Sequence, residues 1–321
     1  MADMTWSSDG VTPRVAKGAG ADAEVRMRRR RRRETIFVWL GVASTFVALV
    51  TLAALLIDLL IAGYPRLTWD FFVNFPSRRA SQAGILSAWV GSLLVILVTA
   101  VIGVFLGVSA GIYLEEYARR NWITNIIEIN ISNLAGVPSI VYGLLALGLF
   151  VYALGTGRNI FTAGLTLALL ILPIIVVATR EALRAVPASL REAAYGIGCT
   201  KWQVTSDHVL PAALPGVLTG IIIGISRALG ETAPLITIGA LTFIAFLPAP
   251  PVTSEFPFIS FAWLFDGFTV LPIQAFNWIS RPGSDFHANA AAAGIVLLAI
   301  TLGLNSLAIY ARYRLRKKLQ W

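Results

Sequence analysis

The chain has 321 residues, of which 57% are hydrophobic and only 13% are charged, and its mean hydropathy is +0.74. Because soluble domains contain about 25% charged residues, this composition excludes an ordinary soluble globular protein and predicts a membrane protein with about six helical spans. The net charge of +9 would suggest a nucleic-acid partner in a soluble protein, and the single cysteine, Cys199, excludes both an internal disulfide and a cysteine-rich metal cluster.

The first 35 residues form a polar arm that ends in the arginine run 28–33. A basic block can bind nucleic acid, but directly before a hydrophobic span it is typical of a cytoplasmic anchor that contacts anionic lipid. We therefore expect residues 1–35 to be a disordered cytoplasmic arm whose partner is membrane lipid and not nucleic acid. The apolar stretch 36–62 is longer than the core of a signal peptide, about 7–15 residues, so it is predicted to remain as the first span.

Hydropathy predicts an all-α integral membrane protein with six transmembrane helices. The predicted spans are residues 36–62, 85–114, 132–154, 160–179, 213–247 and 290–310. The second span contains Gly103, Gly107 and Gly111 at four-residue spacing, which predicts close approach of another helix. Pro138 in the third span removes a backbone donor and predicts a kink or break there.

The distribution of Lys and Arg predicts the orientation of these spans. If both termini face the cytoplasm, the inner segments contain 20 of these residues and the outer segments contain five. An excess of basic residues is typical of cytoplasmic segments. We therefore expect both termini, and the long polar loop 180–212, to lie on the cytoplasmic side.

The loop 180–212 is longer than a typical connection between spans and contains helix signals of its own. Pro187 is suited to the first turn of a new helix, and Gly198 follows that helix. Thr200 and Gln203 match a capping box that starts a second helix. Two short helices with a glycine bend between them would form a docking surface for a partner.

Arg227 and Glu231 lie inside the fifth apolar stretch and, four residues apart, can share one helix face. A guanidinium in hydrocarbon costs about 2.5–3.5 kcal/mol on insertion scales. Either the two charges neutralise each other and hold the helix in place, or Arg227 faces a central pathway and offers its forked donors to an oxyanion. Gly230 and Pro234 predict an interrupted helix whose free backbone groups could line a cavity.

A resemblance to a known family appears in the long loop. The EAA sequence at residues 192–194, followed by Gly198 and by Leu210-Pro211, resembles the EAA loop of ABC importer permeases, although His208 stands where that pattern has isoleucine. The resemblance implies that six residues couple the chain to a cytoplasmic ATPase subunit: Glu192, Ala193, Ala194, Gly198, Leu210 and Pro211.

Residues 226–235 (SRALGETAPL) resemble the signature of the permeases of phosphate ABC importers. Residues 136–144 (GVPSIVYGL) and the ending 290–314 are similar to the same family. The resemblance implies that Arg227 and Glu231 lie on the pathway of inorganic phosphate.

The resemblance covers residues 36–318 and implies a type I (MetI-like) importer permease fold in the bacterial plasma membrane. It also implies a complex with a PstC-like sister permease, two PstB-like ATPase subunits and a PstS-like phosphate-binding protein. The chain contains no G-x-x-x-x-G-K-[ST] motif. We therefore expect a non-catalytic subunit without a cofactor of its own, with ATP and Mg²⁺ on the partner ATPase subunits.

Several alternatives remain open at this point. The chain could be a permease for another oxyanion, such as sulfate or molybdate, because a buried arginine does not distinguish these anions. It could be a non-transporting membrane scaffold or sensor that recruits a partner through residues 180–212, or a stand-alone secondary transporter. The two histidines, His208 and His287, are isolated in sequence, and we expect neither to belong to a metal site.

Overall fold

The computed structural model describes residues 17–119, 121–252, 258 and 260–319. In this part of the chain, helices are joined by turns and loops, and there is no β-strand. The elements in chain order are α1 (Lys17–Gly63), η1 (Tyr64–Arg66), α2 (Trp69–Val73), η2 (Ala80–Gln82), α3 (Leu86–Ile112), η3 (Tyr113–Tyr117), α4 (Trp122–Leu134), α5 (Ser139–Ala146), η4 (Leu147–Ala153), α6 (Ile160–Arg184), α7 (Ala188–Gly196), α8 (Lys201–Gln203), η5 (Val204–Val209), α9 (Leu210–Gly230), α10 (Ala233–Thr237), η6 (Ala262–Phe265), α11 (Leu271–Ile279) and α12 (Ser284–Leu319).

Five helical segments of the described residues are long and apolar enough to cross a membrane. They are Arg33–Arg66, Leu86–Tyr117, Ile160–Arg184, Lys201–Gly230 and Ser284–Arg314. The pair Trp122–Leu134 and Ser139–Ala153, bent by 109°, provides a sixth if it is one broken span. The predicted all-α fold is therefore confirmed, and the described residues provide five spans, or the predicted six if the bent pair is one span.

The N-terminal arm differs from its prediction. The chain divides into two compact units, Met1–Asp58 and Leu59–Trp321, and in the first of them helix α1 already begins at Lys17. The expectation of disorder over residues 1–35 is thus wrong for residues 17–35, whereas residues 1–16 lie outside the described part. The reason is local, because this stretch contains seven Arg and three Ala, which are strong helix formers.

Two predicted spans had the wrong bounds. The third, predicted at 132–154, begins ten residues earlier, at Trp122, and is broken before α5, where Pro138 has the extended ψ of 135°. The break at this proline was predicted. The start of the span was not, because the polar residues of α4 lower the hydropathy there. The fifth span was predicted at 213–247, but its long helix ends at Gly230. The short α10 follows, and residues 238–247 are not helical.

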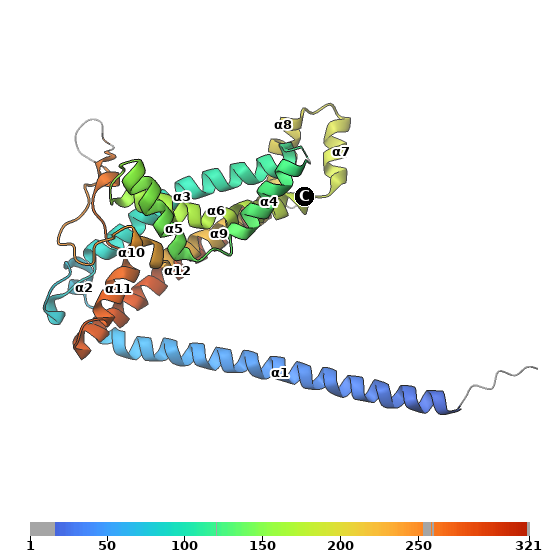
Figure 1. Ribbon diagram of the computed structural model, residues 1–321, viewed down its shortest axis with the longest axis horizontal. Coiled ribbons are helices and arrows are strands. Elements are labelled where there is room, and N and C mark those ends of the chain that lie inside the picture. The colour runs from blue at the N-terminus through green and yellow to red at the C-terminus, as the bar shows by residue number, and fades with distance from the viewer. Residues whose placement is uncertain (1–16, 120, 253–257, 259, 320–321) are drawn as a thin grey trace, which may run out of the picture. The chain divides into compact units, whose positions relative to one another are not determined.

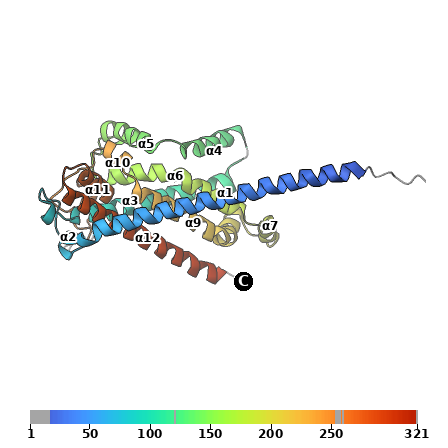
Figure 2. The same cartoon turned by 90° about the horizontal axis from the view of Figure 1, so that it is seen from below.

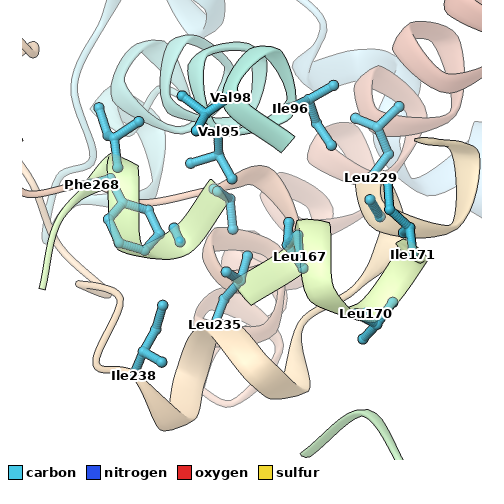
Figure 3. Close-up of a cluster of buried hydrophobic side chains, with 14 of the residues drawn as sticks. Val95, Ile96, Val98, Leu167, Leu170, Ile171, Leu229, Leu235, Ile238 and Phe268 are labelled. Carbon is cyan, nitrogen blue, oxygen red and sulfur yellow. The ribbon is translucent and has the colours of Figure 1, made fainter. Parts of the chain in front are cut away.

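The glycines of α3 allow it to pack closely on α6. A Cβ atom added at Gly107 would lie 2.8 Å from Cγ2 of Ile175, and one at Gly111 would lie 2.7 Å from Cβ of Thr179. These separations are shorter than van der Waals contact, so the predicted close approach of a second helix is confirmed and the helix is α6. Side chains of both helices, together with residues from α9, α10 and the loop after η6, form the main buried cluster (Figure 3).

Replacing Gly107 by isoleucine should lower the thermal unfolding temperature of the purified protein in detergent. The added side chain has no space against Ile175, and overpacking a well-packed interior costs about 1–3 kcal/mol. Gly303→Ile in α12 is the matched control, because a Cβ at that position would meet no atom of another described element within 4 Å. Equal unfolding temperatures for the two variants would contradict the packing described here.

The long helices of the unit Leu59–Trp321 form a bundle with two distinct ends. Helix α7 lies at one end, whereas α2, α10 and α11 lie at the opposite end (Figures 1 and 2). Helix α9 leads from α8 at the first end to α10 at the second. The loop 180–212 and the Arg227–Glu231 pair, about 25 Å apart at 1.5 Å per residue along α9, are therefore connected by one continuous helix.

Candidate functional site

Arg227 and Glu231 lie where α9 ends. The Arg227 Nε donates to Oε1 of Glu231 at 3.3 Å, which confirms the predicted pairing across one helical turn. Helix α9 stops at Gly230, and Glu231 has an extended backbone with ψ of 125°. Pro234 accounts for this stop, since its ring would clash with the carbonyl of Gly230 in a continuous helix. The predicted interruption of the helix is thus confirmed.

The two charged side chains have different surroundings. Glu231 has a side-chain exposure of 17% and lines a small internal cavity of about 10 Å³ with Ser92 and Val95 of α3. Arg227 has a side-chain exposure of 39%, and its two terminal amino groups make no hydrogen bond within the described part of the chain. The carboxylate therefore orients the guanidinium while leaving its forked donors available to a ligand.

Helix α5 supports the break after α9. Gly143 of α5 contacts the Thr237 hydroxyl, and a Cβ added at this glycine would lie 2.6 Å from Cα of Pro234. The hydroxyl of Tyr142 donates to the Leu134 carbonyl at 2.8 Å and so spans the bend between α4 and α5. Two interrupted helices, α4–α5 and α9–α10, are therefore packed against each other beside the charged pair.

The loop 180–212 has the predicted two-helix form. Helix α7 ends at Gly196, Gly198 has a φ of +87°, and α8 begins at Lys201. The Thr200 side chain and the Gln203 side chain each bond to the other's backbone N–H, so the capping box is confirmed. After α8 comes η5, a π-helical turn that continues directly into α9. A rigid path therefore joins the loop to the charged pair.

The six residues expected to couple to a partner are not equally placed. Glu192, Ala193 and Gly198 are exposed, and Leu210-Pro211 are half-buried at the start of α9. Ala194 is buried in the cluster that also contains Leu183, Val186, Val204 and Val209. Ala194 therefore cannot contact a partner directly, because the face of α7 that carries it packs mainly on η5.

The sequence analysis missed an apolar surface beside the EAA sequence. Ile197 and Trp202 are 78% and 68% exposed. These two apolar residues within an otherwise polar loop were the signal that could have revealed it.

An ion-pair network beneath the loop was also missed. The Glu115 carboxylate accepts from Arg184 at 2.8 Å and from Arg180 at 3.3 Å, and Arg180 also binds Glu128 at 2.6 Å. Arg180 and Glu115 are mostly buried, with side-chain exposures of 10% and 12%. Partners 65 residues apart in sequence carry no local signal.

Residues 103–320 match the family of binding-protein-dependent transport system inner membrane components. The match spans more than half of the chain, and the chain belongs to this family. It is therefore a multi-pass protein of the plasma membrane and a membrane component of a transport system.

Several proteins similar to this chain are named as phosphate transport permeases. The chain is 34% identical to the phosphate transport system permease protein PstA of Yersinia pestis over 285 residues, which cover 87% of this chain and 88% of the relative. It is 31% identical to PstA of Pasteurella multocida over 282 residues, covering 86% and 92%. It is also 36% identical to PstA 1 of Mycobacterium tuberculosis over 208 residues, covering 62% and 68%.

Solved structures confirm the permease fold. A chain of a bacterial alginate ABC transporter superposes with a TM-score of 0.62 at 13% identity, covering 90% of this chain and 98% of that one. A chain of the MetNI methionine ABC transporter in an inward-facing conformation gives a TM-score of 0.53 at 19% identity, covering 72% and 94%. At these identities the likeness shows the fold alone.

Proposed function

We propose that this chain is a permease subunit of an ATP-driven importer of inorganic phosphate. The observation that carries the proposal is the Arg227 guanidinium, whose terminal donors are unpaired among the described residues and which lies beside a helix break in a membrane protein. A forked pair of N–H donors matches the geometry of phosphate oxygens. The similarity to permeases named PstA supports phosphate as the anion.

Arg227 and Glu231 have opposite roles in this proposal. Arg227 attracts the anion and binds its oxygens. The Glu231 carboxylate, whose Oε1 lies 3.3 Å from the Arg227 Nε, repels the anion and so limits how tightly it is held. A pathway needs both the attraction and the repulsion, because an anion that binds too tightly does not leave.

The loop 180–212 provides the proposed contact with the ATPase. Its exposed residues Glu192 and Ala193, with the bend at Gly198, would dock on a cytoplasmic PstB-like subunit, two copies of which serve the complex. The sister permease would be PstC-like and the binding protein PstS-like. In this arrangement both termini are cytoplasmic, and residues 36–318 form the permease domain.

The chain itself would not hydrolyse ATP. It contains no P-loop motif, so ATP and Mg²⁺ would bind to the partner subunits. Closure of the ATPase dimer would move α7 and α8, and this motion would pass through η5 and α9 to Arg227. Arg227 would then face the two sides of the membrane alternately.

The proposal is tested by uptake of labelled phosphate into lipid vesicles that contain the purified complex. We expect uptake with ATP and binding protein, none without ATP, and competition by unlabelled phosphate but not by sulfate or molybdate. Vesicles containing only the ATPase subunits are the control.

The other outcomes identify the alternatives. Equal competition by sulfate or molybdate would assign a different oxyanion, and uptake that persists without ATP would indicate a secondary transporter. Absence of uptake together with anion-independent ATP hydrolysis would favour a scaffold or sensor.

A further inference from the structure

The end of α3 is a π-helical turn, Tyr113–Tyr117, which we call the YLEEY turn after its sequence. It lies outside the EAA sequence, and nothing in the proposed function assigns it a role. Three consecutive residues of this turn, Glu115, Glu116 and Tyr117, contact three successive elements of the loop region. π-Helical turns are uncommon and are frequently found at functional sites.

Glu116 binds the proposed coupling helix α7. Its Oε1 accepts from the Arg191 terminal amino group at 2.8 Å, and the two side chains are only 10% and 23% exposed. Arg191 also donates to the carbonyls of Val186 and Leu183, each at 2.8 Å. One guanidinium therefore joins α7, the end of α6 and the YLEEY turn.

The neighbouring residues extend this attachment. Glu115 binds Arg184 and Arg180 at the end of α6, as described above. The Lys201 ammonium of α8 lies over the Tyr117 ring, 5.0 Å from its centroid. Both short helices of the loop are thus fixed to the end of α3 as well as to α9, into which the chain continues.

At its other end, α3 reaches the charged pair. Ser92 and Val95 of α3 line the small cavity that also contacts Glu231. Between the two ends, Gly107 keeps α3 in close contact with α6, so α3 cannot bend easily within the bundle. A displacement of the YLEEY turn would therefore also move Ser92 and Val95, which lie beside Glu231.

We infer that Glu116 is a positioning residue for energy coupling. Through it, α3 transmits the movement of the loop 180–212 toward the charged pair, as α9 does. The Glu116–Arg191 pair ties the movement of α7 to α3, so that α3 and α9 move together on the two sides of Glu231. Removing one member of a mostly buried ion pair leaves the other charge uncompensated. The inference rests on the proposed coupling of this loop to an ATPase.

The test compares Glu116→Gln, Arg191→Gln and the double variant in the reconstituted complex. Glu116→Gln keeps the side-chain shape and leaves both carbonyl contacts of Arg191 in place. The measured quantity is phosphate taken up per ATP hydrolysed, which should fall by about fivefold or more, the lower end of typical coupling factors. The double variant should be no worse than the single ones, because residues that act as one unit are not additive.

The control is Asp285→Asn. Asp285 is exposed in the first turn of α12, outside both the loop 180–212 and the YLEEY turn, and it forms no ion pair with the described residues. This variant should keep the wild-type ratio. A reduced ratio in Asp285→Asn equal to that of Glu116→Gln, or a wild-type ratio in Glu116→Gln, would overturn the inference.

A second readout does not depend on the transported anion. Hydrogen–deuterium exchange of the peptide containing the YLEEY turn should change when the wild-type complex binds ATP, and this change should be absent in Glu116→Gln. If wild-type vesicles take up no phosphate but show this pattern, the proposed substrate fails and the inference stands. No ATP-dependent change in the wild type, or loss of the ATPase subunits from the Glu116→Gln complex, would refute it.

Discussion

A complex carrying Arg227→Gln is expected to take up labelled phosphate at least about a hundredfold more slowly than the wild type while remaining assembled. Glutamine retains hydrogen-bonding groups but has neither the positive charge nor the paired terminal N–H donors of the guanidinium. Two hydrogen bonds to a charged group, each worth about 1.5–3 kcal/mol, are then lost from the bound anion. The measurement is initial uptake into vesicles, with subunit composition checked by gel filtration.

The control for this prediction is Arg281→Gln. Arg281 lies in the turn between α11 and α12, and its guanidinium lies over the Phe286 ring at 4.9 Å. The same change of charge at this position should leave uptake close to that of the wild type. Uptake at the wild-type rate in Arg227→Gln would remove Arg227 from the pathway. Loss of assembly in that variant would instead assign it a structural role.

Gly198→Val is expected to separate ATP hydrolysis from transport, or to release the ATPase subunits. Gly198 has a φ of +87°, a conformation that costs an ordinary residue about 1–2 kcal/mol and a β-branched residue more. The bend would relax to a negative φ and redirect α7 relative to α8. The exposed Glu192 and Trp202 would then no longer face one partner surface together. ATPase activity and phosphate uptake, measured on the same preparation, report the two outcomes.

The matched variant is Gly196→Val. Gly196 is the last residue of α7 and its φ is not positive, and an added Cβ would meet no atom of another described element within 4 Å. Valine at this position adds the same side chain to the same bend without the conformational strain. Normal subunit binding and normal uptake in Gly198→Val would argue against the docking assignment, whatever the result for Gly196→Val.

Features set by short-range chemistry could be predicted from the sequence. The glycine stripe of α3, the capping box at Thr200 and the pairing of Arg227 with Glu231 each depend on residues within about two turns of one another. Their physical causes, which are side-chain size, backbone capping and helical spacing, can be read from the chain directly. Each was confirmed.

Features set by tertiary contacts could not be predicted. Hydropathy alone does not show where a helix ends, so the bounds of the fifth span, 213–247, were wrong even though Gly230 and Pro234 predicted the interruption itself. The Glu116–Arg191 pair joins residues 75 positions apart, and in the sequence each appears as an ordinary charge flanking a span. The inward position of Ala194 depends on how α7 packs on η5, which no local pattern specifies.

The π-helical turn η5, Val204–Val209, has a consequence for the rotation of α9. A π-helical turn holds one residue more than an α-helical turn, and each residue of an α-helix corresponds to about 100° of rotation. The angle of the Arg227 side chain about the helix axis, relative to the loop 180–212, is therefore determined by how many residues η5 and α9 contain. Substitutions in this segment keep that direction, whereas the loss or gain of one residue would turn the guanidinium away from its neighbours. Chain length between Lys201 and Arg227 is thus under tighter constraint than side-chain identity.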